Sequence, residues 1–332
     1  MKISKKTVMF FAAGLTAFGI IISFIGLLVV KFDFKKFGTQ EFDEHTYELV
    51  ESFDKISMDV GSIDVKFVLS KDGKCKIVCR DETTVNHYAQ VEEGSLVIKT
   101  EDNRRWYHKI GLFFESAKMT VYLPQGAYTS LAVNSDAGDI MIPEEFTFAN
   151  LQIDGNTLDV KCAASVSGAM KIKLSTGDIK LEKLSVGQID IGTSTGDIKL
   201  NAVTVSGNTC ISTNTGDVNL KDISCVNLTV ECGTGDTALK NIIANNLISI
   251  ECDTGDVKFD GSDAWRIVVK TNTGDVKGTV LSDKVFICET STGKVEVPES
   301  VTGGKCEVKT DTGDIKLSIK PTEPPAEEKE SK

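Results

Sequence analysis

The sequence predicts an all-β protein, a parallel β-solenoid of about ten coils of 19–20 residues, preceded by one N-terminal transmembrane helix. Three observations support this prediction. The phrase Thr-Gly-Asp returns at a fixed spacing, apolar and polar residues alternate on both sides of each copy, and an uncharged apolar run lies near the start of the chain. The first two observations indicate stacked strands, and the third indicates a membrane span.

The spacing of the repeated phrase is the strongest single signal. Its glycines stand 19 or 20 residues apart from Gly177 to Gly313, and periods of this length are typical of solenoids. An upstream relative, Ala137-Gly138-Asp139, leaves room for one degenerate repeat around Thr157-Leu158-Asp159. The regular glycines are Gly177, Gly196, Gly216, Gly235, Gly255, Gly274, Gly293 and Gly313, and Gly293 differs from the others in being followed by lysine, Lys294.

Alignment of the repeats on this glycine shows period-two alternation with many β-branched residues. The position five residues before the glycine holds Ile172, Ile191, Ile211, Val230, Ile250, Val269, Cys288 and Val308. The position two residues after it holds Ile179, Ile198, Val218, Thr237, Val257, Val276, Val295 and Ile315. Each repeat is therefore predicted to be two short strands joined by a glycine turn.

A single repeat of this size cannot fold alone. About five inward apolar side chains contribute roughly 2 kcal/mol each, whereas ordering the repeat costs roughly 20–40 kcal/mol of entropy. Stacking the repeats pairs their strands and creates one continuous core. We therefore expect residues 125–318 to form a right-handed solenoid, roughly 50 Å long at ~4.8 Å per coil.

The composition excludes some classes of partner. The formal net charge is −11, whereas nucleic-acid binding needs basic patches, so no nucleic-acid partner is expected. His45, His87 and His108 are too few and too scattered for a histidine-built metal site.

The first 30 residues have the charge pattern of a membrane anchor. Residues 1–6 form a basic head, and residues 7–30 contain no charged side chain. As a helix Val8–Val30 covers about 34 Å, enough to cross a bilayer. The alternative is a cleaved signal peptide, whose apolar core is usually shorter and ends at a small-residue site, whereas this run ends Leu-Leu-Val-Val before Lys31.

The remaining regions follow from the anchor and the repeat. We expect the solenoid to lie outside the cell membrane, although Lys31, Lys35 and Lys36 nearly balance the basic head. Residues 31–50 are predicted to be a juxtamembrane spacer, and residues 51–124 to be strand-rich capping coils that cover the first edge of the solenoid. Residues 319–332 contain three prolines and few apolar residues, which predicts a disordered tail.

Several short motifs give the chain a resemblance to one known family. They are the start Phe53-Asp54-Lys55-Ile56, the strand Gly94-Ser95-Leu96-Val97-Ile98, the strand end Tyr122-Leu123-Pro124 and the tandem Gly-Asp-Ile/Val turns. In these features the chain resembles the bacterial "putative adhesin" family, also called DUF4097, over roughly residues 50–318. The resemblance implies an exported or membrane-tethered β-repeat domain and brings no catalytic residues.

The aspartates after the turn glycines permit two interpretations, a calcium ladder or a structural turn. Calcium-binding solenoids offer several ligands per turn, whereas each coil here offers one regular aspartate, so we expect a structural role and no metal or cofactor. An Asx-type hydrogen bond and nearby lysines would offset the repulsion between coils. The aspartates are Asp139, Asp178, Asp197, Asp217, Asp236, Asp256, Asp275 and Asp314, and the lysines are Lys180, Lys199, Lys258, Lys277 and Lys316.

A catalytic site is not predicted. Enzymes built on β-helices need convergent carboxylates or a basic residue in a cleft, and inserted loops wall such clefts. Between Gly177 and Gly313 no coil departs from 19–20 residues, so no such insertion is present there. We expect no catalytic residues and no small-molecule substrate.

The nine cysteines are predicted to be free thiols in the core. Cys232, Cys252 and Cys288 fall in inward positions, and Cys162 and Cys306 follow the same alternation. The sequence contains no Cys-x-x-Cys motif, so a zinc site is not expected.

One segment, Arg104-Arg105-Trp106-Tyr107-His108-Lys109 followed by Leu112-Phe113-Phe114, concentrates basic and aromatic residues. It is interpreted either as a loop that contacts lipid headgroups or a partner, or as a hairpin that covers the open end of the core.

These patterns predict a non-enzymatic, membrane-anchored cell-surface solenoid, an adhesin-like, scaffold or interaction module. Its expected partners are the membrane itself and either an envelope polymer or a membrane protein. Two alternatives stay open, an accessory component of membrane-stress signalling and a carbohydrate-active β-helix enzyme.

Overall fold

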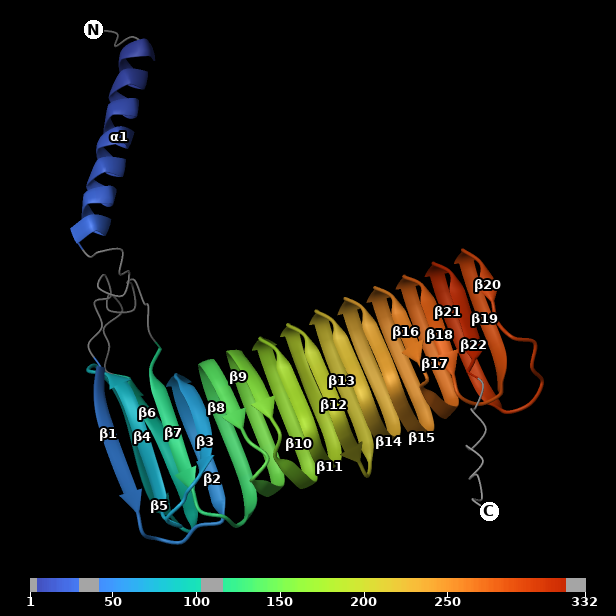
Figure 1. Cartoon of the computed structure of the whole chain (residues 1–332), viewed down its shortest axis with the longest axis horizontal. Coiled ribbons are helices and arrows are strands. Elements are labelled where there is room, and N and C mark those ends of the chain that lie inside the picture. The colour runs from blue at the N-terminus through green and yellow to red at the C-terminus, as the bar shows by residue number, and fades with distance from the viewer. Residues whose placement is uncertain (1–4, 30–41, 103–115, 321–332) are drawn as a thin grey trace, which may run out of the picture.

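The computed structural model describes residues 5–29, 42–102 and 116–320. In these ranges the chain forms one helix and a 22-stranded sheet that winds into a parallel β-solenoid of about ten turns (Figure 1). The predicted fold class is confirmed.

The helix α1 covers Lys5–Val29. The strands are β1 (Phe42–Leu49), β2 (Lys55–Ser62), β3 (Asp64–Leu69), β4 (Cys75–Glu82), β5 (Val85–Glu92), β6 (Ser95–Asp102), β7 (Lys118–Leu123), β8 (Ala127–Ile142), β9 (Thr147–Cys162), β10 (Ser165–Thr176), β11 (Ile179–Thr195), β12 (Ile198–Val205), β13 (Asn208–Thr215), β14 (Val218–Thr234), β15 (Thr237–Thr254), β16 (Val257–Asp260), β17 (Asp263–Thr273), β18 (Val276–Val280), β19 (Lys284–Thr292), β20 (Val295–Glu296), β21 (Gly304–Thr312) and β22 (Ile315–Ile319).

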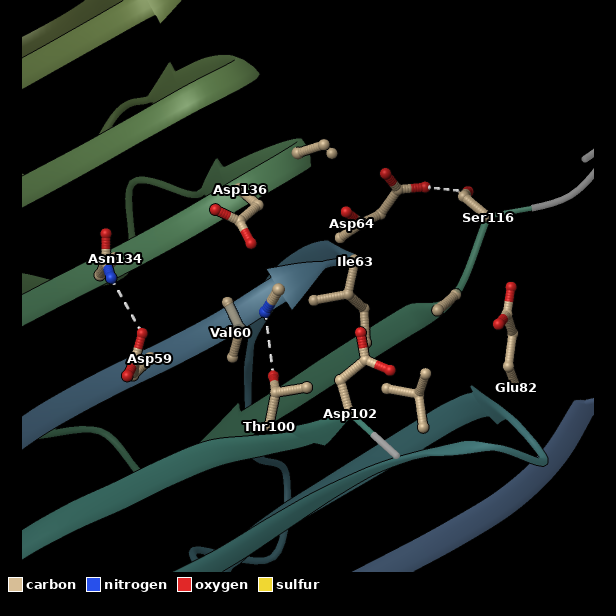
Figure 2. A pocket seen from close by; sticks show the side chains of 16 residues that line it. Asp59, Val60, Ile63, Asp64, Glu82, Thr100, Asp102, Ser116, Asn134 and Asp136 are labelled. Atoms are coloured by element: carbon tan, nitrogen blue, oxygen red, sulfur yellow. Dashed lines mark hydrogen bonds between the residues drawn. The ribbon is translucent and has the colours of Figure 1, made fainter. Parts of the chain in front are cut away.

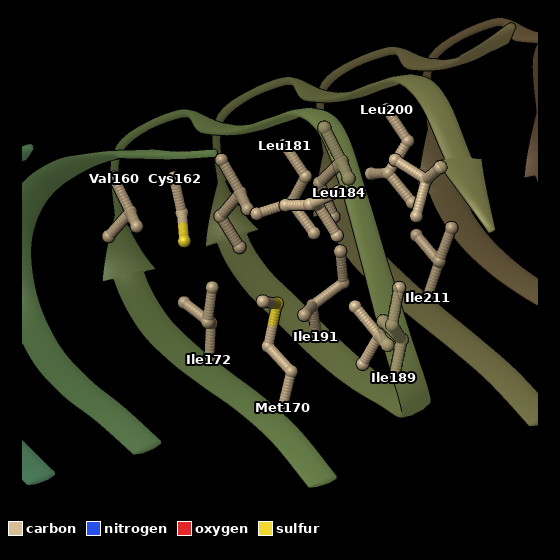
Figure 3. Packing of buried hydrophobic residues seen from close by; sticks show 14 of the residues in the cluster. Val160, Cys162, Met170, Ile172, Leu181, Leu184, Ile189, Ile191, Leu200 and Ile211 are labelled. Carbon is tan, nitrogen blue, oxygen red and sulfur yellow. The ribbon is translucent and has the colours of Figure 1, made fainter. Parts of the chain in front are cut away.

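Equivalent positions of successive coils lie opposite each other in parallel register. Ile172 pairs with Ile191, and Ile191 pairs with Ile211. All three side chains are buried, and in Figure 3 they face Leu181 and Leu200 across the interior. Each apolar side chain therefore contacts its counterparts above and below, which is how the alternating pattern becomes one continuous core.

The turn glycine is required for two reasons, as Gly235 shows. Its φ is 144°, a conformation that residues with a side chain rarely adopt. A Cβ atom at this position would also clash with the carbonyl oxygen of Gly216 on the preceding coil. The turn thus needs glycine both for its own backbone geometry and for the close approach of the next coil.

A second corner of the coil was not predicted from the sequence. In the five coils from Gly177 to Gly255, the residue six positions after the turn glycine has a positive φ, from 52° at Lys183 to 62° at Gly261. Asp222 and Asn241 tolerate this conformation, but Lys183 and Ala202 give no such signal. Tertiary stacking enforces the corner, because each coil must bend where its neighbours bend.

The degenerate repeat is present where the sequence suggested it. Thr157 pairs with Ala137 on one side and with Thr176 on the other. Leu158, which replaces the turn glycine here, lies opposite Gly138 and is buried.

The coils at the N-terminal end do not stack in chain order. β2 pairs with β6 on one side and β8 on the other, and β3 pairs likewise with β7 and β8. The coil that comes first in the sequence therefore lies between the next two. Beyond it, β1, β4 and β5 join the sheet in antiparallel pairs (Figure 1).

The C-terminal end has the same kind of exchange. β17 and β18 pair with β21 and β22, which pair in turn with β19 and β20. The coil formed by β21 and β22 thus lies between the coil of β17 and β18 and the coil of β19 and β20. The coil that carries Gly293 and Lys294 is therefore outermost.

Candidate functional site

The aspartates after the turn glycines form a hydrogen-bonded ladder between coils. The backbone N–H of each aspartate donates to the Oδ1 atom of the aspartate on the adjacent coil. The donor–acceptor pairs are Asp178–Asp159 (2.8 Å), Asp197–Asp178 (2.8 Å), Asp217–Asp197 (2.9 Å), Asp236–Asp217 (2.8 Å), Asp256–Asp236 (2.9 Å), Asp275–Asp256 (3.0 Å) and Asp314–Asp275 (2.6 Å). The prediction of an Asx-type bond within one turn was wrong about the partner, because the donor lies one coil away.

The two ends of the ladder have different partners from its middle. At the N-terminal end the N–H of Asp139 donates to Oδ1 of Asp64 at 3.1 Å. At the other end the N–H of Lys294 donates to Oδ1 of Asp314 at 2.9 Å. Because the Lys294 coil is outermost in the described solenoid, a carboxylate there would have no next coil to accept from. A lysine is therefore tolerated at that position.

Lysines balance part of the charge on this ladder. Lys199 lies 2.9 Å from Asp197, and Lys277 lies 2.5 Å from Asp275. Lys258 contacts Asp236 at 3.1 Å. Two of the predicted lysines instead pair with glutamates, Lys180 with Glu182 (3.0 Å) and Lys316 with Glu296 (2.8 Å).

These contacts shift the pKa values of the carboxyl groups. The N–H of Asp217, with a smaller effect from Lys199, holds the pKa of Asp197 below its ordinary value. The Lys277 ammonium does the same to the pKa of Asp275. By contrast, burial raises the pKa of Asp139, aided by the neighbouring Asp159. Across the described residues no three histidine, cysteine or acidic side chains come together as a metal-binding group.

Seven of the nine cysteines are buried, as expected of small apolar residues, and the expectation of a core position is wrong for Cys210. All nine are free thiols, and Cys162, Cys232, Cys252 and Cys306 are buried as predicted, while Cys288 is half-buried. Cys210 is exposed. Burial raises the pKa of Cys162 and Cys306 to about 12, so these thiols stay protonated at neutral pH.

An acidic groove of about 650 Å³ opens between the N-terminal coils (Figure 2). Carboxylates from the five strands β2, β3, β4, β6 and β8 line it, together with Thr100, Ser116 and Asn134. The acidic residues are Asp59, Asp64, Glu82, Asp102 and Asp136.

Several of these polar groups already hold the coils together. Asn134 Nδ2 donates to Asp59 Oδ1 at 2.9 Å, and Ser116 Oγ donates to Asp64 Oδ2 at 2.6 Å (Figure 2). The Gly61 N–H donates to Thr100 Oγ1 at 2.9 Å. Each bond links β2 or the start of β3 to a strand or segment distant in the sequence, which indicates a structural role for these side chains.

A buried Asp–His pair in the N-terminal strands was not predicted from the sequence. His87 Nδ1 lies 2.8 Å from Asp81 Oδ1, and the His87 N–H donates to Asp81 Oδ2 at 3.0 Å. Both side chains are buried, and His87 Nε2 has no partner within the described part of the chain. The pair ties β4 to β5. His45 lies on β1, whereas the basic–aromatic segment 104–114, with His108, lies outside the described residues.

The N-terminal helix differs from the solenoid in what its side chains contact. Met9–Val29 has a mean hydropathy of 2.3, and none of this stretch is buried against the rest of the protein. The helix is long and apolar enough to cross a bilayer, a property that membrane anchors and signal sequences share.

Comparisons with solved structures found several similar chains. The chain is similar to a "putative adhesin" from Parabacteroides distasonis (13% identity, 85% of this chain and 98% of that one, TM-score 0.46). It is also similar to "putative adhesins" from Parabacteroides merdae (12%, 86% and 98%, 0.44) and Bacteroides fragilis (15%, 83% and 97%, 0.40). No curated protein matches the sequence.

A family model agrees with the motifs, the repeat and the fold. The model described as Toastrack DUF4097 matches residues 53–208 and 210–326, which is most of the chain. The match includes most of the N-terminal strands, the repetitive coils and the glycine turns. The chain belongs to the Toastrack DUF4097 family.

Proposed function

We propose that this chain is a single-pass membrane protein that displays its solenoid outside the cell membrane as an adhesin-like interaction module without catalytic activity. The observation that carries the proposal is the unburied apolar helix Met9–Val29 on the same chain as a fully wound solenoid. Phe10 and Phe11 are 80% and 72% exposed. Such side chains cost roughly 1.5–3 kcal/mol each in water, and a bilayer removes that cost.

The solenoid supports a binding role rather than a catalytic one. Its regular carboxylates accept hydrogen bonds from neighbouring coils or pair with lysines, as at Asp197, Asp236 and Asp275. A general acid or base must instead reach a substrate proton. Stacked coils offer a long, rigid outer surface, which suits the binding of an extended partner.

Display of the full-length chain on cells tests this proposal. Protease added to intact cells should degrade the solenoid, and cells with the chain should adhere to immobilised envelope polysaccharide more than cells without it. The released polysaccharide should keep its chain length. A solenoid protected from external protease, or new reducing ends in the polysaccharide, would contradict the proposal.

A further inference from the structure

At one corner of the solenoid three successive coils carry glycine, whereas the following coils carry larger residues, Val226 and then Asn246 and Trp265. Gly168, Gly187 and Gly207 stack at this corner, and Gly304 lies against the Trp265 carbonyl on the next coil. Trp265 is 69% exposed. A tryptophan that is mostly exposed contributes little apolar burial to the fold, and it becomes informative where other exposed apolar side chains lie beside it.

A second apolar side chain breaks the pattern beside it. The outward column of Ser185, Thr204 and Ser224 continues in register to Ile243, which is 43% exposed. Leu281 follows nearby and is 38% exposed. Two apolar side chains thus lie close together on the outer surface, where they add nothing to the buried core.

These side chains surround a groove of about 650 Å³, which is within the size range of small-ligand sites. We name it the Trp265 groove; its lining includes Ile243, Asn245, Trp265, Leu281, Ser282, Asp283 and Thr302. Gly303 and Gly304 lie in the same lining and add no side chain to it.

The charges at the base of the groove are largely compensated. Lys284 is buried, with Nζ 2.6 Å from Asp263 Oδ1 and in contact with Ser282 Oγ. Asp283 is the other acidic group of the lining. The groove therefore combines an aromatic face with mainly neutral hydrogen-bonding groups. A sugar ring has matching chemistry, because it offers an apolar C–H face and hydroxyl groups that donate and accept.

We propose that the Trp265 groove binds one or two sugar units of a glycan, with a ring stacked on the Trp265 indole. Asn245, Ser282 and Asp283 supply hydrogen bonds to the hydroxyl groups. This inference rests on the proposed function and names the chemical class of the partner. A cationic ligand over the indole is the competing chemistry, and it would need the Asp283 carboxylate charge.

Glycan binding by the full-length protein in detergent micelles tests the inference. The probes are purified bacterial surface polysaccharide fragments in one arm and animal cell-surface glycans in the other, which identifies the source. Trp265→Ala should weaken binding about ten-fold or more, as expected for a tryptophan at the centre of a site. Trp265→Phe should retain part of the affinity. Tyr88→Ala, which removes an exposed aromatic ring on β5, is the matched control and should bind normally.

Two further measurements keep the test decisive. The chain has two tryptophans, so Trp106→Phe leaves Trp265 as the fluorescent reporter, and its emission should shift on glycan binding. Asp283→Asn should weaken glycan binding only a few-fold, whereas it should abolish binding of a quaternary ammonium probe. Unchanged thermal unfolding of Trp265→Ala shows that the variant is folded.

The outcomes separate this inference from the proposed function. No binding to either glycan set, equal binding by Trp265→Ala, or binding of the ammonium probe alone would overturn the glycan site. If cells with Trp265→Ala still adhere like wild type, the groove inference fails while the adhesin-like function stands. If wild-type cells do not adhere although the purified protein binds glycan, the proposed function fails and the groove remains.

Discussion

Lys284 Nζ lies 2.6 Å from Asp263 Oδ1 although β21 separates the strands that carry these two residues. Lys284 pairs in the sheet with Gly304 of β21. Glycine at that position leaves no side chain between the lysine and Asp263. The ion pair therefore bridges the inserted coil and holds the outermost coil to the third.

We expect Lys284→Met to destabilise the protein by about 3 kcal/mol, because it leaves the Asp263 carboxylate without its partner at a mostly buried position. Denaturant unfolding of the full-length chain in micelles measures the change. Lys284→Met combined with Asp263→Leu should recover much of the loss. A single variant as stable as wild type would show that the ion pair does not hold the end together.

Gly235→Val should prevent folding or destabilise the chain by more than about 4 kcal/mol. The φ of 144° is unfavourable for a β-branched residue, and the new side chain would clash with the carbonyl oxygen of Gly216. The midpoint of denaturant unfolding measures the change. The effect should be cooperative, because the coil of Gly235 stacks on a coil at either side. A midpoint near that of wild type would mean that the coils can separate locally at little cost.

Asp236→Asn should cost only about 0–1 kcal/mol. The asparagine oxygen can still accept the Asp256 N–H (2.9 Å in the native bond), and what is lost is an exposed pair with Lys258. Asp236→Ala should cost about 1–2 kcal/mol, as for the loss of a cap, because it removes the acceptor as well. If Asp236→Asn proved the worse of the two, the carboxylate charge itself would be essential, which would indicate a cation on this corner.

The ladder also predicts how stability changes with pH. The pKa values of Asp197, Asp236 and Asp275 are lower in the folded chain than in the unfolded chain, so their contribution is present above about pH 4 and is lost as the pH falls through the folded values. Asp139, whose pKa is raised, acts in the opposite direction. The thermal midpoint of unfolding should therefore decrease as the pH is lowered from about 5 to about 2. Asp139→Asn should raise the midpoint at pH 7, and a flat profile would contradict the assignment.

Removal of divalent metals should leave the thermal midpoint unchanged. Each regular ladder carboxylate from Asp159 to Asp275 already accepts a backbone N–H from the adjacent coil, so a cation is not needed to hold the coils together. Scanning calorimetry with and without a chelator measures this. A drop of many degrees that calcium restores would overturn the structural interpretation of the aspartates.

The N-terminal helix should remain on the mature protein. The apolar stretch Met9–Val29 is longer than the usual core of a signal peptide. N-terminal sequencing of the membrane fraction should therefore recover the start of the full chain, and the protein should resist alkaline carbonate extraction. A mature chain that begins near residue 31 would show that the segment is a cleaved signal.

The repeated coil could be predicted because its determinants are local. The period-two alternation around Ile191 and Ile198 decides which side chains point inward, and Gly196 marks the turn between them. The positive-φ corner at Lys183 and Ala202 could not be predicted in this way, since neither residue favours that conformation by itself.

The candidate binding groove could be predicted only in part. Ile243 departs from a serine–threonine column, and Trp265 lies at a corner that is glycine in three earlier coils. Their proximity to Asp283 and Thr302 depends on how the last coils are placed, which the repeat spacing does not specify.

By itself the sequence determined the apolar helix, the coil length, the inward and outward faces and the turn glycines, because each depends on residues close together in the chain. Only the tertiary structure decided the order of the end coils, the coil-to-coil partners of the aspartates, and the Lys284–Asp263 bridge. The physical reason is that similar coils offer nearly equal pairing surfaces. Long-range contacts specific to the ends, such as this ion pair, must distinguish one stacking order from another.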